Sequence, residues 1–253
     1  MFSEERLDKI LDLLGQRKRV SAKEAAAYCH ISLGTARRDF KKLAERNQVI
    51  RMHGGILAKD DYAYESATDV RKREHIATKK AIACKAAEFV DDGEVVAIDA
   101  GTTTVYAVEH LKERKHLTVV TYSLDIANET VKYSHLTTLI AGGTIRHKTL
   151  SIMGPETIAM LQKIHIDTLL LATSALTLEN GLMNGNSMEA EVKKMLMKIA
   201  DRIILLVDSS KIYKKALISF ASIEDVDVLI TDRGAEPSFL QQVAERQVEL
   251  ITV

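Results

Sequence analysis

The chain has 253 residues, 46% of them hydrophobic and 28% charged, and no run in it approaches the ~18 consecutive apolar residues of a membrane span. This length allows one large hydrophobic core and a smaller second one, and the charged start, MFSEERLDKI, is unlike a signal peptide. The formal net charge of zero hides an asymmetry, because residues 1–57 carry 12 Lys and Arg against 7 Asp and Glu. We therefore expect a globular, cytoplasmic protein, not associated with a membrane, whose N-terminal segment binds a polyanion.

Residues that commonly serve metal and covalent chemistry do not cluster in the sequence. The two cysteines, Cys29 and Cys84, lie far apart within helical patterns, and the eight histidines show no paired metal-ligand spacing. No G-x-S-x-G or HExxH signature is present. The sequence predicts no disulfide, no metal site, no cofactor and no catalytic residue.

Three short helices are predicted within residues 1–57. The first has apolar residues at helical spacing from Leu7 to Leu14, and the second opens at a capping box, Ser21-Ala22-Lys23-Glu24, and ends near His30. The third follows Ser32, an N-cap residue. The positions predicted to face a common core are Leu7, Ile10, Leu11 and Leu14, then Ala22, Ala25, Ala26 and Cys29, and finally Leu33, Ala36, Phe40 and Leu43.

The outward face of the third predicted helix is cationic. It carries Thr35, Arg37, Arg38, Lys41 and Lys42. Two helices joined by a tight turn, the second with cations near its start, are typical of a helix-turn-helix that inserts a recognition helix into the major groove. Arg37 and Arg38 point about 100° apart around the helix, so one can pair with a guanine edge while the other binds a phosphate.

Residues 47–57, NQVIRMHGGIL, predict a β-wing after the third helix. Val49, Arg51 and His53 alternate before a Gly-Gly turn, which places Arg51 and His53 on the DNA-facing side. Taken alone, the cationic helix could equally be a solvated face, but the capped helix before it and the wing after it favour DNA binding. The residues predicted to contact DNA are Ser32, Thr35, Arg37, Arg38, Lys41, Lys42, Arg51, His53, Gly54 and Gly55.

The stretch TARRDFKKLAERNQVIRMHGG resembles the signature of DeoR-family transcriptional regulators, with T-x-R-R-D-L in the third helix and R-x-H-G-G at the wing. The matching residues are Thr35, Arg37, Arg38, Asp39, Arg51, His53, Gly54 and Gly55. Phe40 stands where the family usually has Leu, at a core position. The resemblance continues almost to the end of the chain. It implies a winged helix-turn-helix domain followed by a domain that senses phosphorylated sugars and resembles the ribose-5-phosphate isomerase and CoA-transferase fold.

Beyond the wing, the hydrophobic pattern changes twice. Residues 58–73 are polar at first and lack periodicity, which predicts a linker, and a helix then leads to DDG at residues 91–93. Short apolar runs follow, separated by helical stretches: VVAID, LTVVTY, LTTLIAGG, TLLLAT, RIILLVD, VDVLITD and VELITV. This alternation predicts an α/β domain over residues 74–253, with a mostly parallel sheet covered on both faces. Pro155 and Pro237 are expected near helix starts.

Polar motifs follow four of these predicted strands, where α/β sheets bind their ligands. DAGTTT (residues 99–104) follows a strand and opens a helix, so its backbone N–H groups and hydroxyls favour a phosphate, although the spacing is not that of a Walker loop. TYS (121–123), AGGTIR (141–146) and DSSK (208–211) end three more strands. Each motif by itself also fits an ordinary turn or helix cap. Together they predict one site for an anionic, hydroxyl-bearing ligand such as a sugar phosphate.

The family resemblance implies the same site. Its D-x-G-T-T loop, G-G strand end, D-x-S-K segment and E-A-x-x-K helix match Asp99, Gly101, Thr102, Thr103, Gly142, Gly143, Asp208, Lys211, Glu189, Ala190 and Lys193. Tyr122 and Ile212-Tyr213 depart from the family pattern beside this site, so the ligand cannot be taken from a relative. The residues predicted to bind the effector are Asp99, Gly101, Thr102, Thr103, Thr104, Tyr122, Ser123, Gly142, Gly143, Arg146, Glu189 and Lys211.

These observations favour a sequence-specific regulator of transcription that binds double-stranded operator DNA. The resemblance implies a repressor of a sugar or sugar-alcohol operon, controlled by a phosphorylated sugar, and palindromic operators imply a homo-oligomer of at least two chains. One alternative is a sugar-phosphate isomerase-like enzyme fused to a DNA-binding domain, with Asp99, Glu189 and Lys211 as its reacting groups. Another is an N-terminal module for oligomerisation or RNA contact. The paired arginines and the wing favour DNA.

Overall fold

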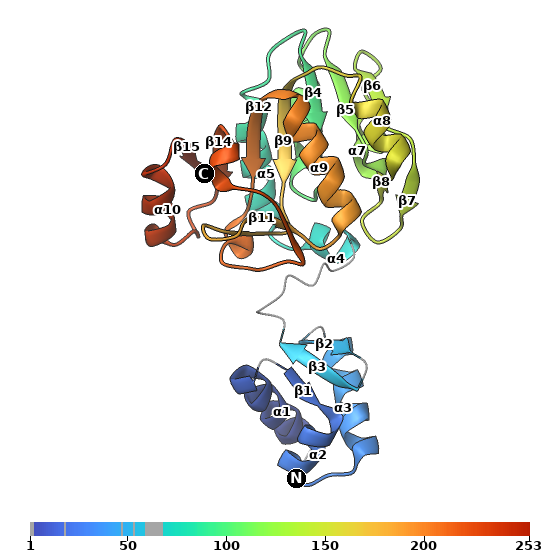
Figure 1. Cartoon of the computed structure of the whole chain (residues 1–253), viewed down its shortest axis with the longest axis vertical. Coiled ribbons are helices and arrows are strands. Elements are labelled where there is room, and N and C mark those ends of the chain that lie inside the picture. Colours follow the sequence, from blue (N-terminus) through green and yellow to red (C-terminus); the bar gives the residue numbers. More distant parts are fainter. Residues whose placement is uncertain (1–2, 18, 47, 53, 59–67) are drawn as a thin grey trace. The chain divides into compact units, whose positions relative to one another are not determined.

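The computed structural model describes residues 3–17, 19–46, 48–52, 54–58 and 68–253. The chain divides into two compact units, Met1–Tyr64 and Glu65–Val253 (Figure 1). Within the described residues, no helix is both long and apolar enough to cross a membrane.

The first unit packs three helices against a small antiparallel sheet. The helices are α1 (Ser3–Arg17), α2 (Ala22–Cys29) and α3 (Leu33–Glu45), and the strands are β1 (Arg19–Ser21), β2 (Val49–Met52) and β3 (Gly55–Ala58). The sheet order is β1-β3-β2, so the predicted wing hairpin is present and gains a third strand from before α2. Strand β1 has no counterpart among the predicted elements, because three residues are too few for a period-2 pattern.

The predicted caps and core of this unit are confirmed, with one exception. Ser21 and Glu24 form the capping box, and the Ser32 hydroxyl accepts from the Thr35 N–H at 3.1 Å. Leu33, predicted to face the core, is instead 42% exposed. It is the first residue of α3, one turn before the first buried position, so it lies at the edge of the packed region.

An ion pair joins the inward face of α3, which also carries the buried Ala36, Phe40 and Leu43, to α1. Asp39 is 2% exposed, and its carboxylate accepts from Arg6 of α1 through Nε at 2.6 Å and Nη2 at 3.0 Å. This hydrogen bond raises the pKa of the Arg6 guanidinium above its ordinary value. With Asp39 pointing inward, Arg37 and Arg38 are left exposed.

The second unit is built on a seven-stranded sheet whose paired strands are all parallel. Its order is β15-β14-β12-β9-β4-β5-β6. The strands are β4 (Val95–Ile98), β5 (Thr118–Thr121), β6 (Thr137–Ile140), β9 (Ile166–Ala172), β12 (Ala200–Leu206), β14 (Val228–Thr231) and β15 (Glu249–Thr252). Each of the seven apolar runs predicted as strands is a strand here, which confirms the α/β fold class.

The chain enters this sheet in the middle and builds outward in both directions. After β4 it adds β5 and β6 on one side, and then it returns to add β9, β12, β14 and β15 on the other. The direction of winding therefore reverses between β4 and β9. At such a reversal the loops leaving the two strands turn to opposite sides and open a crevice at their carboxyl ends.

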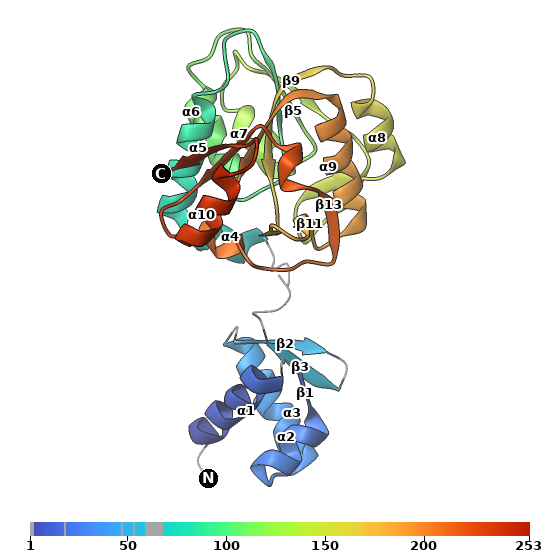
Figure 2. The same cartoon turned by 60° about the vertical axis from the view of Figure 1, so that its left-hand side comes forward.

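Helices cover both faces of the sheet, as Figures 1 and 2 show. One face packs against α5 (Ile76–Ala87), α6 (Ala107–Leu111) and α7 (Leu124–Thr130), and the other against α8 (Pro155–Leu161), α9 (Ser187–Ile199) and α10 (Pro237–Ala244). Successive strand residues alternate between the two cores: Leu169 and Leu171 of β9 join the core under α9, and Leu170 joins the core under α5. Pro155 and Pro237 begin their helices as predicted.

Several short elements of the second unit are not predicted by the hydrophobic pattern. They are a hairpin of β7 (Thr144–Arg146) and β8 (Ser151–Met153), a sheet of β10 (Ala175–Thr177), β11 (Gly181–Asn184) and β13 (Ile218–Ala221), and helix α4 (Thr68–Arg73). α4 falls inside the stretch expected to be a linker but belongs to the second unit. Residues 59–67 of that stretch lie outside the described part of the chain.

Asp39→Ala should loosen the packing of α3 against α1, because the Arg6 guanidinium, 15% exposed, loses its carboxylate partner. A hydrogen bond to a charged group of this kind is worth about 2 kcal/mol. In hydrogen exchange of the full-length chain, amides of α1 and α3 should open more readily, and amides of α9 should be unchanged. Glu4→Gln, which breaks an exposed pair with Arg46, is the matched control and should have a much smaller effect. Unchanged exchange in Asp39→Ala would refute the structural role of the pair.

Candidate functional site

The cations predicted to contact DNA lie on the outer surface of the first unit. Arg37, Arg38, Lys41 and Lys42 are exposed along α3, and Arg51 is exposed on β2. Two of them make weak, local contacts: Arg38 donates to the Thr35 hydroxyl at 3.4 Å, and Lys41 lies 3.8 Å from Glu45. These side chains can exchange such contacts for phosphates or base edges at small cost.

The glycines of the wing serve its geometry. Gly54 has φ +83°, which favours glycine, and a Cβ on Gly55 would lie 2.6 Å from the carbonyl oxygen of Val20, because β3 runs tightly against β1. Ser32 and Thr35 bind each other through their hydroxyls at 2.9 Å at the start of α3. His53, also predicted to contact DNA, lies outside the described residues.

In the second unit, a cleft opens at the carboxyl ends of β4, β9 and β12, beside the reversal in strand order. It is lined by the loops 100–103, 172–174 and 206–208. Side chains from other elements complete the lining: Arg71, Asn184, Glu189, Lys193 and Lys211. We call it the switch-point cleft. Its lining combines three cations, the two carboxylates of Glu189 and Asp208, and several hydroxyls.

A buried ion pair lies directly beneath this cleft. Asp99, which is fully buried, pairs with Lys193 of α9, and the Lys193 ammonium also donates to the Ala172 carbonyl at 2.9 Å. The Ala172 N–H donates to the Asp99 carboxylate at 2.8 Å. Asp99 therefore joins β4 to β9 and α9, and its carboxylate supports the cleft from below.

Tyr122 lies behind Asp99 and does not line the cleft. It is 1% exposed, and its hydroxyl donates to the Asp99 carboxylate. Burial, together with the negative charges of Asp99 and Glu189, raises the pKa of the Tyr122 phenol well above its ordinary value. The phenol therefore remains a hydrogen-bond donor to Asp99.

Glu189 is held by groups from three other elements. Its carboxylate accepts from the Thr149 and Ser151 hydroxyls and from the Asn184 amide at 3.1 Å, and it pairs with Arg146 at 3.3 Å. Burial raises the pKa of the Glu189 carboxyl, but the two hydroxyls and the charges of Lys193 and Arg146 outweigh burial and hold the pKa below its usual value. Glu189 is therefore an ionised acceptor at the cleft wall.

The structure does not bring all predicted effector residues to the cleft. Gly101, Thr102, Thr103, Glu189 and Lys211 line it, whereas Asp99, Thr104, Tyr122, Ser123, Gly142, Gly143 and Arg146 do not. The Thr104 hydroxyl donates to the Asp99 carbonyl at 2.6 Å, Ser123 caps α7, and the Gly142 carbonyl accepts from Thr157 at 2.8 Å. The contacts of Thr104, Ser123 and Gly142 are those of ordinary turns and helix caps.

Other lining residues were missed or were named only through the resemblance. Thr173 and Ser174 follow β9, and the reversal of strand order would have pointed to them, but that order is not visible in the sequence. Lys193 entered only as part of the E-A-x-x-K match. Arg71 and Asn184 carried no local signal at all.

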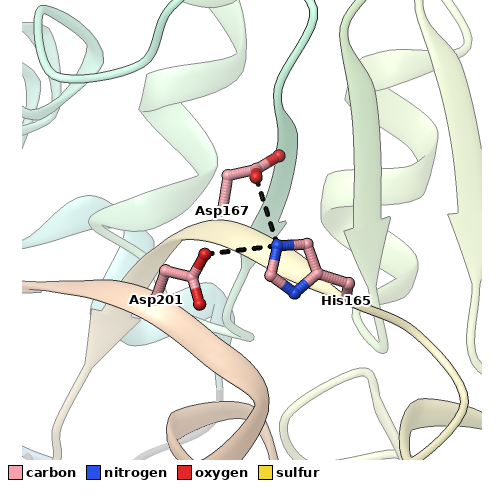
Figure 3. A group of neighbouring side chains, drawn as sticks. All are labelled: His165, Asp167 and Asp201. Atoms are coloured by element: carbon pink, nitrogen blue, oxygen red, sulfur yellow. Dashed lines mark ion pairs between the residues drawn. The ribbon is translucent and has the colours of Figure 1, made fainter.

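Three side chains lie close together at the amino-terminal ends of the strands, where β9 and β12 begin (Figure 3). His165 Nε2 lies 3.4 Å from Asp167 and 3.2 Å from Asp201. Their ligand atoms lie within 4.8 Å of one another, as a metal site would require. The other Asp167 oxygen accepts from the Val95 N–H at 2.7 Å, and His165 is 65% exposed, so ion pairing between strand ends accounts for the group.

Glu189→Gln should destabilise the chain near neutral pH, and less so as the pH falls. Because the folded-state pKa of Glu189 is lowered, its stabilising contribution is complete above the ordinary pKa of 4.5 and is lost as the pH falls through the lowered value. Free energies of unfolding from urea titrations should therefore converge for wild type and variant on the acid side. Glu191→Gln, on the exposed face of the same helix, is the control. A difference that persists well below pH 4.5 would contradict a role for the charge.

Comparisons with known proteins agree with this two-unit organisation. Residues 6–61 match the family model "DeoR-like helix-turn-helix domain", and residues 74–233 match "DeoR C terminal sensor domain". A ribose 5-phosphate isomerase from Plasmodium falciparum is a structural neighbour with a TM-score of 0.39 and 21% identity, covering 54% of this chain and 52% of that one.

Three curated relatives align over nearly their whole length. The uncharacterized HTH-type transcriptional regulator YulB of Bacillus subtilis is 30% identical over 100% of this chain and 98% of its own. The L-fucose operon activator of Haemophilus influenzae is 32% identical over 96% and 97%, and the transcriptional repressor GlcR of B. subtilis is 29% identical over 99% and 96%. These matches favour a regulator over the isomerase-like alternative. The chain belongs to the DeoR family and is a DNA-binding transcriptional regulator with an N-terminal helix-turn-helix domain and a C-terminal sensor domain, as its sequence predicts, and not an enzyme.

Proposed function

We propose that this regulator represses genes for the use of a sugar or sugar alcohol and that the phosphorylated form of that compound, bound in the switch-point cleft, controls it. The observation that carries the proposal is the cleft itself, which Arg71 and Lys211 line together with Gly101–Thr103. Cations and N–H groups suit a phosphate, and the hydroxyls of Thr102 and Thr103 suit sugar hydroxyls. The relatives include both an activator and a repressor, so repression is part of the proposal.

The interior of the cleft supports sensing without chemistry. Proton abstraction from a sugar needs a carboxylate held ready as a base near the substrate. The Asp99 carboxylate is occupied by Lys193, Tyr122 and the Ala172 N–H, and the Glu189 carboxylate is occupied by hydroxyl and amide donors. Both carboxylates have the environment of structural acceptors.

On the DNA side, we assign α3 to the major groove and the β2–β3 hairpin to the adjacent backbone. The recognition surface comprises the exposed Arg37, Arg38, Lys41, Lys42 and Arg51, and His53 remains a prediction from the sequence. At least two chains act together, because a twofold assembly matches a palindromic operator and raises the effective concentration of the second domain. Ligand binding shifts this assembly between forms that do and do not match the half-site spacing.

Arg37→Ala and Arg38→Ala should each weaken binding to operator DNA. The variant that loses a phosphate contact should also lower the slope of log affinity against log salt by about 1. The variant that loses a base contact should relax sequence preference at one base pair by about 1–3 kcal/mol. Fluorescence anisotropy with a duplex that the wild type selects from a random library measures both effects. Lys9→Gln, an exposed cation on α1, is the control, and unchanged affinity and slope in both arginine variants would overturn the assignment.

A phosphorylated sugar or sugar alcohol should raise the unfolding temperature of the full-length protein, and its unphosphorylated form should not. At 100 times its dissociation constant, a ligand stabilises the folded state by ~2.7 kcal/mol, a rise of several degrees for a chain of this size. Lys211→Gln should reduce the rise, and Lys215→Gln, an exposed lysine nearby in sequence, should not. If no compound in a broad panel shifts the transition, the proposed effector class is wrong.

A further inference from the structure

Leu33, the first residue of α3, has an apolar side chain that lies outside the core of the DNA-binding unit. It is 42% exposed, whereas Ala36, Phe40 and Leu43 of the same helix are buried. Arg37, one turn further along α3, is also exposed. Residues four apart lie on the same side of a helix, so Leu33 borders the cationic surface assigned to DNA. That surface therefore begins with an apolar side chain.

The start of α3 fixes the backbone of Leu33. The Ser32 hydroxyl accepts from the Thr35 N–H at 3.1 Å, and the Ser32 carbonyl accepts from the N–H groups of Thr35 and Ala36, both at 3.0 Å. The hydroxyls of Ser32 and Thr35 also bind each other at 2.9 Å. Because these bonds span Leu33, its exposure is not that of a frayed helix end.

Gly34, the next residue, leaves the backbone bare beside Leu33. It is exposed, and a Cβ on it would lie 3.8 Å from the Ser32 hydroxyl oxygen, an ordinary contact distance. Glycine is a poor helix former, and neither packing against the described residues nor a positive φ requires it here. A glycine in such a place suits the close approach of another molecule to the backbone.

We propose that Leu33 contacts the C5-methyl group of a thymine in the operator, and that Gly34 allows the start of α3 to come close to that base. This inference rests on the proposed placement of α3 in the major groove. In a helix-turn-helix, the N-terminal residues of the recognition helix contact base edges. The thymine methyl is the apolar group that base pairs present there, and a leucine side chain has no donor or acceptor for their polar atoms. Leu33 therefore determines specificity for thymine at one position of a half-site.

The test exchanges thymine for uracil, which lacks only the C5-methyl group, at one position of the selected duplex at a time. Fluorescence anisotropy gives the affinity of the full-length protein for each duplex. For the wild type, one exchange in a half-site should lower the affinity about fourfold, the value of one buried methyl group. Leu33→Ala should bind the thymine duplex more weakly, and the same exchange should then have no further effect. The slope of log affinity against log salt should be unchanged in Leu33→Ala, because no charge is removed.

Two further leucine variants provide controls. Leu217→Ala makes the same substitution at a leucine of the sensor unit that is 71% exposed, and it should respond to uracil as the wild type does. Leu33→Met remains apolar and should keep the penalty for the uracil exchange.

Gly34→Ala separates stability from DNA binding. It should slow hydrogen exchange of the α3 amides, because alanine is the better helix former. It should nevertheless lower the affinity for the selected duplex about tenfold, because the added methyl group overpacks the contact between α3 and the base. Slower exchange combined with weaker binding excludes unfolding as the cause of the loss. Unchanged affinity in Gly34→Ala would refute the close approach.

Failure of this inference and failure of the proposed function give different results. If the wild type selects no duplex, or if Arg37→Ala and Arg38→Ala bind the selected duplex as the wild type does, the placement of α3 is wrong and this inference fails with it. If both arginine variants bind weakly but no uracil exchange lowers the affinity of the wild type, only the contact by Leu33 is overturned. A uracil penalty of equal size in the wild type and Leu33→Ala would also overturn it, because another residue would then contact the methyl group.

Discussion

The buried pair between Asp99 and Lys193 is the interaction on which the arrangement of the sensor unit depends. Two opposite charges taken out of water are tolerated only when every remaining polar atom finds a partner, and removing one member typically costs about 3–5 kcal/mol. Here the Asp99 carboxylate also accepts hydrogen bonds from the Tyr122 hydroxyl and the Ala172 N–H. The Lys193 ammonium also donates to the Ala172 carbonyl and lies 5.7 Å from the centre of the Phe220 ring. The pair holds β4, β9 and α9 together at the reversal of strand order.

The DNA-binding unit also contains an ion pair with a buried carboxylate, between Arg6 and Asp39. Asp39 is buried against Arg6 on the inward face of α3, and the cations on either side of it in the sequence are exposed. In both units, a buried, paired carboxylate lies next in the sequence to residues predicted to bind a ligand. Buried charges of this kind contribute orientation more than net stability, because desolvation offsets much of their attraction.

The sequence was informative wherever the signal is local or periodic. Continuous apolar runs predicted all seven strands of the parallel sheet, and the caps at Ser21 and Ser32 were read from two or three adjacent residues. The site was harder. DAGTTT and DSSK were found because glycines and hydroxyls cluster at strand ends, but Tyr122, expected at the ligand, is packed behind Asp99. A residue type at a strand end does not reveal whether its side chain points out of the sheet edge or back into the core.

By itself, the sequence determined the two-unit organisation, the helix-turn-helix with its wing, the alternation of strands and helices, and membership of the DeoR family, because these depend on periodicity, turn chemistry and contiguous motifs. The tertiary structure alone decided the order of the strands and with it the composition of the cleft. Arg71, Ser174, Asn184 and Lys193 are separated by up to about half the chain, and the packing of α4, α9 and a second small sheet around the seven-stranded sheet brings them together. Long-range contacts of this kind depend on packing between elements, and packing leaves no pattern at any one place in the sequence.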